Sequence, residues 1–259
     1  MLIQSPKNEK VKQWKKLLTK KGREQSGRFI VEGEHLVNEA YEAGVVKELI
    51  ITETFRSKFS ETKFDSVPIQ IISDPLGKMI GETETPQGIF AVCEKKNETK
   101  GDGTRFLLID AVQDPGNVGT MIRTADASGM DAVIVGKGSV DIYNSKVLRA
   151  AQGSHFHLPI IEGQLTEWIA KFKTESIPVY GTSLHKGESM YTVAPSHPFA
   201  LIVGNEGRGV DPTLLQQTTK NLYIPLYGKS ESLNVSVATG ILLYYLRGTD
   251  GFSQRLTEN

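Results

Sequence analysis

The sequence has little of what several large classes of protein require. Among its 259 residues there is one cysteine, Cys93, so the chain can form neither an internal disulfide nor a cysteine-based zinc site. We therefore expect the protein in the reducing cytoplasm. No stretch approaches the roughly 20 apolar residues that a membrane span needs, and the charged N-terminal segment lacks the apolar core of a secretory signal.

Complete glycine-rich cofactor motifs are missing as well. Gly228, Lys229 and Ser230 read GKS, as in the loop that cradles nucleotide phosphates. That loop needs a further glycine five residues before Gly228, where this chain has Tyr223. No Gly-x-Gly-x-x-Gly follows a strand pattern, and no Gly-x-Ser-x-Gly marks a hydrolase nucleophile. These absences argue against a phosphate-loop NTPase, a nicotinamide enzyme and a serine hydrolase.

Candidate metal ligands are sparse too. His155 and His157 are expected on one face of a strand, but no third ligand accompanies them, so a structural or solvated pair explains them better than a metal site. The other three histidines have no recognisable partner, and no pair of carboxylates stands at a catalytic spacing. We therefore expect no bound metal.

Charge is balanced over the whole chain but not along it. Lys and Arg together number 30, as do Asp and Glu, whereas residues 1–28 hold nine basic and two acidic side chains, a net charge of +7. Such a segment is typical of proteins that bind a nucleic-acid phosphate backbone, although a solvated lysine-rich helix would have the same composition. The candidate phosphate contacts in it are Lys7, Lys10, Lys12, Lys15, Lys16 and Arg28.

The first hundred residues alternate between helix and strand patterns. Ser5 and Pro6 predict a helix start, and apolar residues then recur at helical spacing from Val11. Another helix is expected at 34–44, closed by Gly44. The expected strands are 29–33, 46–52, 69–73 and 88–94. This order predicts a small α/β domain over residues 1–97, followed by a charged, glycine-containing linker at 95–104.

The second part of the chain, residues 105–250, has a more regular rhythm of strands and helices. A continuous apolar run at 106–112 is typical of a parallel strand that is buried on both faces. A helix is expected at 117–129, with Asn117 as its cap, and a last helix at 234–248. Further strands are expected at 132–136, 158–162, 178–183, 199–204 and 222–226. We predict a parallel α/β sheet with helices on both faces.

Three loops rich in glycine and polar residues follow strands of this predicted sheet. They are residues 113–123, 204–209 and 227–234, and ligands of such sheets bind beyond the carboxyl ends of the strands. Each loop alone has an ordinary explanation. Glu206 could simply favour a helix N-terminus, and Arg123 could be a surface side chain paired with Asp126.

Together, the three loops resemble the motifs of the SpoU/TrmH family of RNA ribose 2′-O-methyltransferases, in the SPOUT superfamily. The motifs read DPGNVGTMIRTADASG (114–129), LIVGNEGRGV (201–210) and IPLYGKSESLNVSVATGIL (224–242), in the family's order and near its spacing. The N-terminal sequences GRFIVEGEHLVNEA (27–40) and TPQGIFAV (85–92) also resemble the family's substrate-binding domain, which is similar to small ribosomal RNA-binding proteins.

The resemblance implies a fold, a cofactor and a partner that composition could not show. The cofactor is S-adenosylmethionine, held in a deep trefoil knot, and the family is dimeric with an active site completed across the dimer interface. Main-chain groups around Gly204, Ile224 and Leu233 would contact the cofactor. Neighbours that would line the same pocket are Val203, Asn205, Ser232 and Asn234. The polar residues that match the family's catalytic set are Asn117, Arg123, Glu206, Ser232 and Asn234.

The implied reaction is methylation of a ribose 2′-OH in structured RNA, with rRNA favoured over tRNA. The alternative is a non-catalytic RNA-binding or ribosome-assembly protein that keeps the fold. The family proposal makes Arg123 a base that an RNA phosphate activates. Arginine is a poor base, because its pKa exceeds about 12, so an equal alternative is an electrostatic clamp on phosphate and developing alkoxide.

Overall fold

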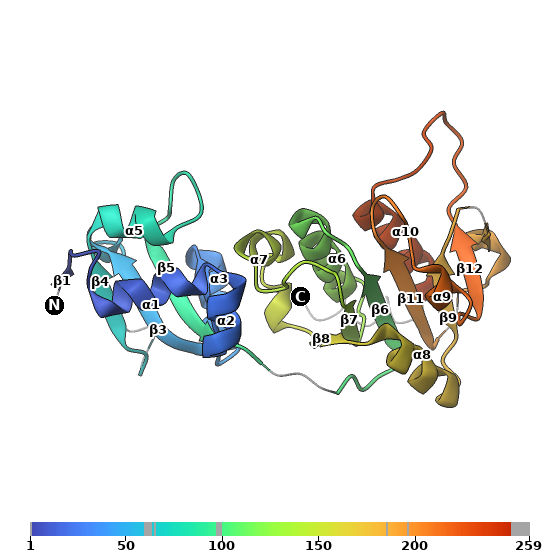
Figure 1. Cartoon of the computed structure of the whole chain (residues 1–259), viewed down its shortest axis with the longest axis horizontal. Coiled ribbons are helices and arrows are strands. Elements are labelled where there is room, and N and C mark those ends of the chain that lie inside the picture. The colour runs from blue at the N-terminus through green and yellow to red at the C-terminus, as the bar shows by residue number, and fades with distance from the viewer. Residues whose placement is uncertain are drawn as a thin grey trace. The chain divides into compact units, whose positions relative to one another are not determined.

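The computed structural model describes residues 2–59, 64, 66–96, 100–184, 186–195 and 197–249 (Figure 1). The chain forms two compact units. The first contains Met1–Asn97 together with Asp141–His157, and the second contains Glu98–Val140 and Leu158–Asn259. The first unit therefore includes a segment that lies inside the 105–250 stretch of the sequence.

A five-stranded mixed sheet forms the centre of the first unit, in the order β1-β4-β3-β5-β2. Strand β5 runs antiparallel to β2 and β3, and the other pairs are parallel. The strands are β1 (Leu2–Ile3), β2 (Arg28–Glu32), β3 (Val46–Thr52), β4 (Ile69–Ile72) and β5 (Ile89–Glu94). The helices are α1 (Glu9–Leu17), α2 (Lys20–Ser26), α3 (Glu34–Glu42), α4 (Glu53–Arg56), α5 (Asp74–Ile80), α7 (Ser145–Ala151) and the 3-10 turn η2 (Ser154–Phe156).

Helix α1 shows how the local sequence builds this unit. Its cap is Asn8, whose side chain accepts from the Lys10 N–H, so the predicted start at Ser5 and Pro6 is wrong. Ser5 instead forms a turn before the helix, with its carbonyl accepting from the Asn8 N–H at 3.1 Å. The predicted apolar stripe is confirmed, because Val11, Trp14 and Leu17 are buried.

Each face of this sheet carries its own core. Val11 and Trp14 of α1 pack with Leu76 and Ile80 of α5 on one face. On the other face, Leu36, Val37 and Ala40 of α3 pack with Leu148 of α7. The predicted end of α3 is confirmed, since Gly44 follows it with a positive φ of 69° that favours glycine.

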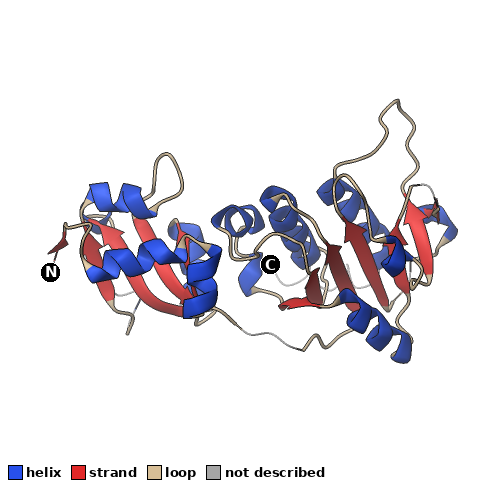
Figure 2. Ribbon diagram, viewed as in Figure 1, coloured by secondary structure: helices blue, strands red, loops and turns tan. Residues whose placement is uncertain are grey.

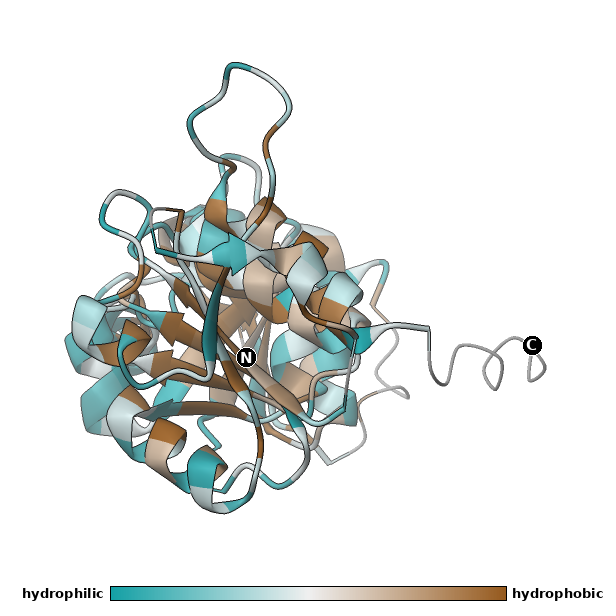
Figure 3. Ribbon diagram, turned by 90° about the vertical axis from the view of Figure 1, so that its right-hand side faces the viewer, coloured by the Kyte–Doolittle hydropathy of each residue, from teal (hydrophilic) through white to brown (hydrophobic). Residues whose placement is uncertain are grey.

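Seven parallel strands form the sheet of the second unit, in the order β10-β12-β9-β11-β6-β7-β8 (Figure 2). They are β6 (Arg105–Asp110), β7 (Ala132–Gly136), β8 (Ile160–Gly163), β9 (Val179–Thr182), β10 (Glu188–Ser189), β11 (Phe199–Gly204) and β12 (Lys220–Tyr223). The helices are α6 (Pro115–Ala127), α8 (Leu165–Thr174), α9 (Pro212–Leu215), α10 (Val235–Arg247) and the 3-10 turn η3 (Met190–Thr192). The predicted parallel α/β sheet is confirmed. Figure 3 shows the apolar strands in brown inside the more hydrophilic helix surfaces.

Two local predictions in the 105–250 stretch are wrong. Helix α6 begins at Pro115 and is capped by Asp114, whose carboxylate accepts from the Asn117 N–H at 2.8 Å. This leaves the Asn117 side chain free for other contacts. His155 lies in the 3-10 turn η2 of the first unit and not on a strand, because Gly153 turns the chain with a φ of 94°.

Two features are absent from the described residues. None of their helices combines the length and apolarity that a membrane span requires. Their His, Cys, Asp and Glu side chains form no group of three or more that could hold a metal ion.

Candidate active site at the carboxyl edge of the parallel sheet

The carboxylate of Glu206 joins the first two motif loops. Strands β6 and β11 are neighbours, with Asp110 opposite Gly204, so the loops that follow them start side by side. Glu206 accepts from the main-chain N–H groups of Gln113 and Asp114, at 3.2 and 3.1 Å, and from Asn117 Nδ2 at 3.1 Å. The predicted site residues Glu206 and Asn117 are therefore in direct contact.

Asn117 carries the connection on to the third motif. Its Oδ1 accepts from Asn234 Nδ2 at 3.0 Å. Asn234 is the cap of α10, and its own Oδ1 accepts from the main-chain N–H and the hydroxyl of Ser236, at 2.9 and 2.6 Å. We call Glu206, Asn117 and Asn234 the relay. It joins the first loop to two loops that lie 89 and 117 residues further along the chain, and each amide has one defined orientation within it.

The environment of Glu206 keeps its carboxyl group ionised. Partial burial acts to raise its pKa, but the hydrogen bonds from Asn117, from its own main chain, and from Asp114 and Gln113 outweigh burial and hold the pKa below the usual value. At neutral pH the group is an acceptor and carries no proton to exchange. Its contacts define a structural role, which is to hold the start of α6 against the second motif loop.

The second motif loop is a tight turn that requires glycine at position 204. A Cβ added to Gly204 would lie 2.2 Å from the main chain of Gly209, so no larger residue fits. Asn205 donates from Nδ2 to the Ala111 carbonyl at 2.9 Å and accepts from the Gly207 N–H at 3.0 Å. Because the Asn205 side chain is used within the protein, Gly204 and Asn205 can offer a ligand only their main chain.

The third motif loop offers main-chain groups that no other part of the described chain uses. Ile224 follows β12 and Leu233 precedes α10. Neither residue donates its N–H or accepts at its C=O in a main-chain hydrogen bond with another described residue. Val203, at the end of β11, supplies a buried apolar wall. Residues 227–234 are exposed, with Ser232 among them, and the loop between β12 and α10 projects from the sheet (Figure 1).

Arg123 lies exposed on α6 and forms no hydrogen bond with the relay residues. It forms no hydrogen bond or ion pair with any described residue, so the alternative of a surface pair with Asp126 is wrong. A planar guanidinium without a protein partner is well suited to grip a phosphate or carboxylate from outside the chain.

The basic side chains predicted to contact RNA in residues 1–28 divide into two groups, according to whether they form an ion pair within the protein. Lys10 pairs with Glu48 at 2.5 Å and Lys12 with Glu9 at 2.6 Å. The predicted phosphate contacts that are exposed and form no ion pair within the described chain are Lys7, Lys15, Lys16 and Arg28. Two of them still act on an acidic side chain at longer range, Lys16 on Glu9 and Arg28 on Glu94.

Two site residues escaped the sequence reasoning. Asp114 caps α6, and Gln113 gives its main-chain N–H to Glu206. The Asp-Pro pair at 114–115 was a usable signal, because Asp is a favoured helix cap and Pro is favoured at the first helical position. Nothing in the sequence could have indicated the main-chain bond of Gln113.

Comparison with known proteins defines the class. Residues 104–244 match the model of the SpoU rRNA methylase family, and residues 8–91 match that of the MRM3-like substrate-binding domain. The chain belongs to the SpoU rRNA methylase family, and the protein is an RNA methyltransferase. The resemblance of the three motif loops is thereby confirmed.

Particular relatives span the whole chain. The 23S rRNA (guanosine(2553)-2′-O)-methyltransferase RlmP of Bacillus subtilis is 50% identical over 95% of this chain and 99% of its own length. The S-adenosylmethionine-bound rRNA methyltransferase of Sinorhizobium meliloti has a TM-score of 0.84 and 28% identity, over 95% of this chain and 97% of that one. The S-adenosylmethionine complex of AviRb from Streptomyces viridochromogenes has a TM-score of 0.83 and 27% identity, over 98% and 100% of the two chains.

Proposed function

We propose that this protein transfers a methyl group from S-adenosylmethionine to a ribose 2′-OH of large-subunit ribosomal RNA. The observation that carries the proposal is the relay, because it brings the three family motifs together with each amide oriented. The relative that is 50% identical is named as a 2′-O-methyltransferase of 23S rRNA. Because this chain matches that relative over 95% of its own length, we propose a target in the same RNA.

The residues present fit S-adenosylmethionine. The free main-chain groups of Ile224 and Leu233 can pair with the polar edge of an adenine. Val203, buried at the end of β11, is proposed as an apolar part of the pocket wall. The tight turn at Gly204 and Asn205 lets main chain approach a ligand closely. When bound, the cofactor supplies the methyl group from its sulfonium, whose positive charge is lost in the transfer.

The relay residues act by position. We assign to Glu206, Asn117 and Asn234 the task of holding the loops that bind the cofactor and orient the hydroxyl, since their polar groups are engaged with one another. Holding two reactants in an attack geometry can supply several kcal/mol of the barrier reduction. Ser232 is exposed in the third loop and free to contact either reactant.

Arg123 is assigned to the RNA. Its unpaired guanidinium would bind a phosphate next to the target ribose and stabilise the alkoxide that develops as the 2′-OH releases its proton to water. The new O–CH3 bond then replaces the S–CH3 bond of the cofactor, which leaves as the neutral thioether. A base role would require an arginine that gives up its own proton, which its pKa disfavours. We therefore favour the electrostatic clamp.

The active form is proposed to be a homodimer through the knotted domain. Along α10, Val237, Ile241 and Tyr244 recur at helical spacing and are 52%, 37% and 57% exposed. Such a stripe on a protein of this size is typical of an interface. Arg123 is exposed on α6, which packs against α10, so a partner subunit seated there would meet it. The trefoil knot and the cytoplasmic location stay predictions from the family resemblance.

The first unit is proposed to hold the substrate RNA. The side chains that form no ion pair in the described chain and can contact phosphates are Lys7, Lys15, Lys16 and Arg28. Specificity for one nucleotide would come from RNA shape around the target.

Labelled methyl transfer tests the proposal. Purified protein, S-adenosylmethionine with a tritiated methyl group, and unmodified transcripts of 23S rRNA, 16S rRNA and tRNA are incubated separately. Label in the 23S transcript alone is expected. Label in tRNA would show that the substrate is tRNA and not rRNA. RNA binding without any label would support the non-catalytic alternative.

A further inference from the structure

One piece of the methyltransferase sequence folds with the substrate-binding unit. Residues 141–157 follow β7 and precede β8, within the stretch 104–244 that matches the methylase family, yet they pack in the same compact unit as Met1–Asn97. Leu148 of α7 lies in the core beside α3, and the Tyr143 ring centroid is 4.6 Å from that of Phe29. The unit is thus built from two separate parts of the chain.

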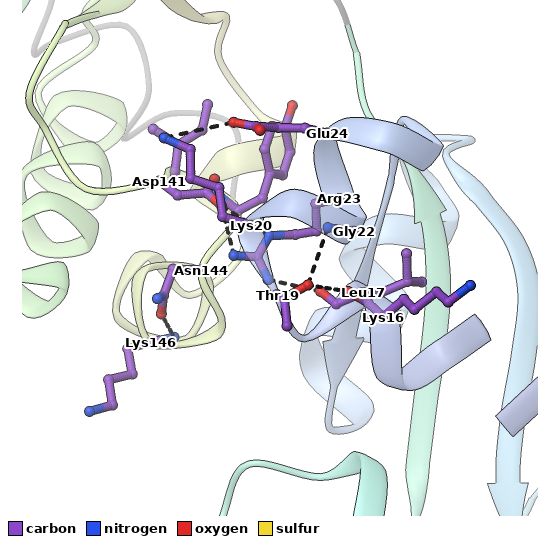
Figure 4. A network of polar contacts seen from close by, with 12 residues as sticks. Lys16, Leu17, Thr19, Lys20, Gly22, Arg23, Glu24, Asp141, Asn144 and Lys146 are labelled. Carbon is purple, nitrogen blue, oxygen red and sulfur yellow. Dashed lines mark hydrogen bonds and ion pairs between the residues drawn. The ribbon is translucent and has the colours of Figure 1, made fainter. Parts of the chain in front are cut away.

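A buried ion pair fastens the start of this segment to α2 (Figure 4). Arg23 donates to Asp141 Oδ2 from Nε and Nη2, at 3.0 and 2.7 Å, and to the Leu17 carbonyl at 2.8 Å. The two charged side chains are only 6% and 9% exposed. The other carboxylate oxygen of Asp141 accepts from the Tyr143 N–H at 2.9 Å. Because a buried pair needs its remaining groups satisfied, this geometry holds the segment in one position.

The other end of the segment is held by α3. The Glu39 carboxylate lies 2.8 Å from His157 Nε2, within hydrogen-bond distance. His35 Nε2 lies 3.1 Å from the Gln152 carbonyl. Helix α7, between these two attachments, is therefore fixed relative to the helices of the N-terminal sequence.

Helix α7 carries an exposed lysine, Lys146. Lys146 is exposed on its first turn, where the cap Asn144 accepts from the Lys146 N–H at 2.9 Å. No acidic side chain of the described chain lies within ion-pair distance of it. Asp141 is the only acid in the segment, and Arg23 neutralises it. Lys16 on α1 and Lys146 on α7 lie on either side of the Arg23–Asp141 pair (Figure 4).

We propose that Lys146 belongs to the RNA-binding surface, together with the unpaired lysines of α1 and α2. Those are Lys15, Lys16 and Lys21, all exposed and none of them in an ion pair within the described chain, although Lys16 also acts at longer range on Glu9. The chemical partner is the phosphate backbone of structured RNA, to which unpaired cations on rigid helices contribute by releasing counterions. The inference deepens the proposed function and rests on it. It assigns substrate capture to a segment of the methyltransferase sequence.

Salt-dependent RNA binding tests this assignment. A 23S rRNA transcript is titrated with the full-length protein over roughly 50 to 400 mM KCl, and the slope of log affinity against log salt is measured. Lys146→Gln is expected to lower the magnitude of the slope by about 0.7 to 0.9, one phosphate contact, with affinity about five- to eightfold weaker near 0.1 M salt. Lys146→Glu should lose more.

A matched control and two readouts keep the outcomes apart. Lys58 is an exposed lysine beyond α4, also without an acidic partner in the described chain, and Lys58→Gln should keep the wild-type slope. Affinity for S-adenosylmethionine and the melting temperature should be unchanged in every variant. If Lys146→Gln behaves as Lys58→Gln does, the assignment of Lys146 is overturned while the proposed function stands. If wild-type protein binds the transcript without salt dependence, the assignment of Lys146 is also overturned, while the proposed methyl transfer is judged by the labelling assay.

Discussion

Replacing Asn117 with alanine removes the middle of the relay and nothing else. The change deletes the hydrogen bond to the ionised Glu206, 3.1 Å long, and the one from Asn234, 3.0 Å long. Hydrogen bonds to charged groups contribute about 1.5–3 kcal/mol and neutral ones about 0.5–1.5 kcal/mol. Because these groups are partly open to water, which can replace the lost partner, the lower ends apply and sum to about 2 kcal/mol.

The third motif loop then loses its tie to the other two, and the cost should fall on cofactor binding. About 2 kcal/mol corresponds to a roughly 30-fold weaker affinity for S-adenosylmethionine, measured by calorimetry at 25 °C. Asp131→Ala is the matched control, because Asp131 accepts two main-chain hydrogen bonds, from Thr104 and Arg105, at the opposite end of β6. It should lower the free energy of unfolding and leave the affinity alone. Wild-type affinity in Asn117→Ala would refute the relay's role.

Three other predictions concern single side chains. Arg123→Ala should abolish turnover with the cofactor affinity unchanged, and Arg123→Lys should keep part of kcat if the role is electrostatic; an inactive Arg123→Lys argues against that reading. Burial lowers the pKa of His155 to about 4, so the free energy of unfolding should fall by up to about 3 kcal/mol as pH drops from 6.5 to 4. His155→Gln, which can still donate to the Ile142 carbonyl, should remove that pH dependence in urea titrations. Burial raises the pKa of the Cys93 thiol, so iodoacetamide at pH 8 should modify it in urea and not in the native protein.

The free energy of unfolding falls with decreasing pH because His155 is neutral in the folded protein. The unfolded chain takes up a proton below about pH 6.5, whereas the folded protein does so only near pH 4. The stability is therefore complete above pH 6.5 and is lost between these two values. A stability that does not change over this range would contradict the burial of a neutral imidazole.

Much of the fold was predictable because its signals are local. The apolar runs at 106–112 and 199–204 became β6 and β11 in the middle of the parallel sheet, since strands buried on both faces need continuous apolar sequence. Gly44 ended α3 as expected. The three motif loops were found from sequence because they follow strands and carry glycine where main chain must pass closely, as at Gly204.

What could not be predicted depends on contacts between distant residues. Asn117 looked like a helix cap, but Asp114 competes for that position and lies next to a proline, so Asn117 is left to join Glu206 and Asn234. Residues 141–157 pack with the first unit through contacts to residues far away in the sequence, such as the ion pair of Asp141 with Arg23, 118 residues earlier. Neither pairing has a periodicity or composition that a single sequence reveals.

The central claim is that the methyl group arrives on a ribose oxygen. The most direct measurement is alkaline hydrolysis of 23S rRNA transcript labelled by this protein with tritiated S-adenosylmethionine. A 2′-O-methyl group blocks cleavage of the neighbouring phosphodiester bond. Label is therefore expected in an alkali-resistant dinucleotide, and none is expected when Arg123→Ala protein is used. Label recovered in mononucleotides would place the methyl group on a base and contradict the account.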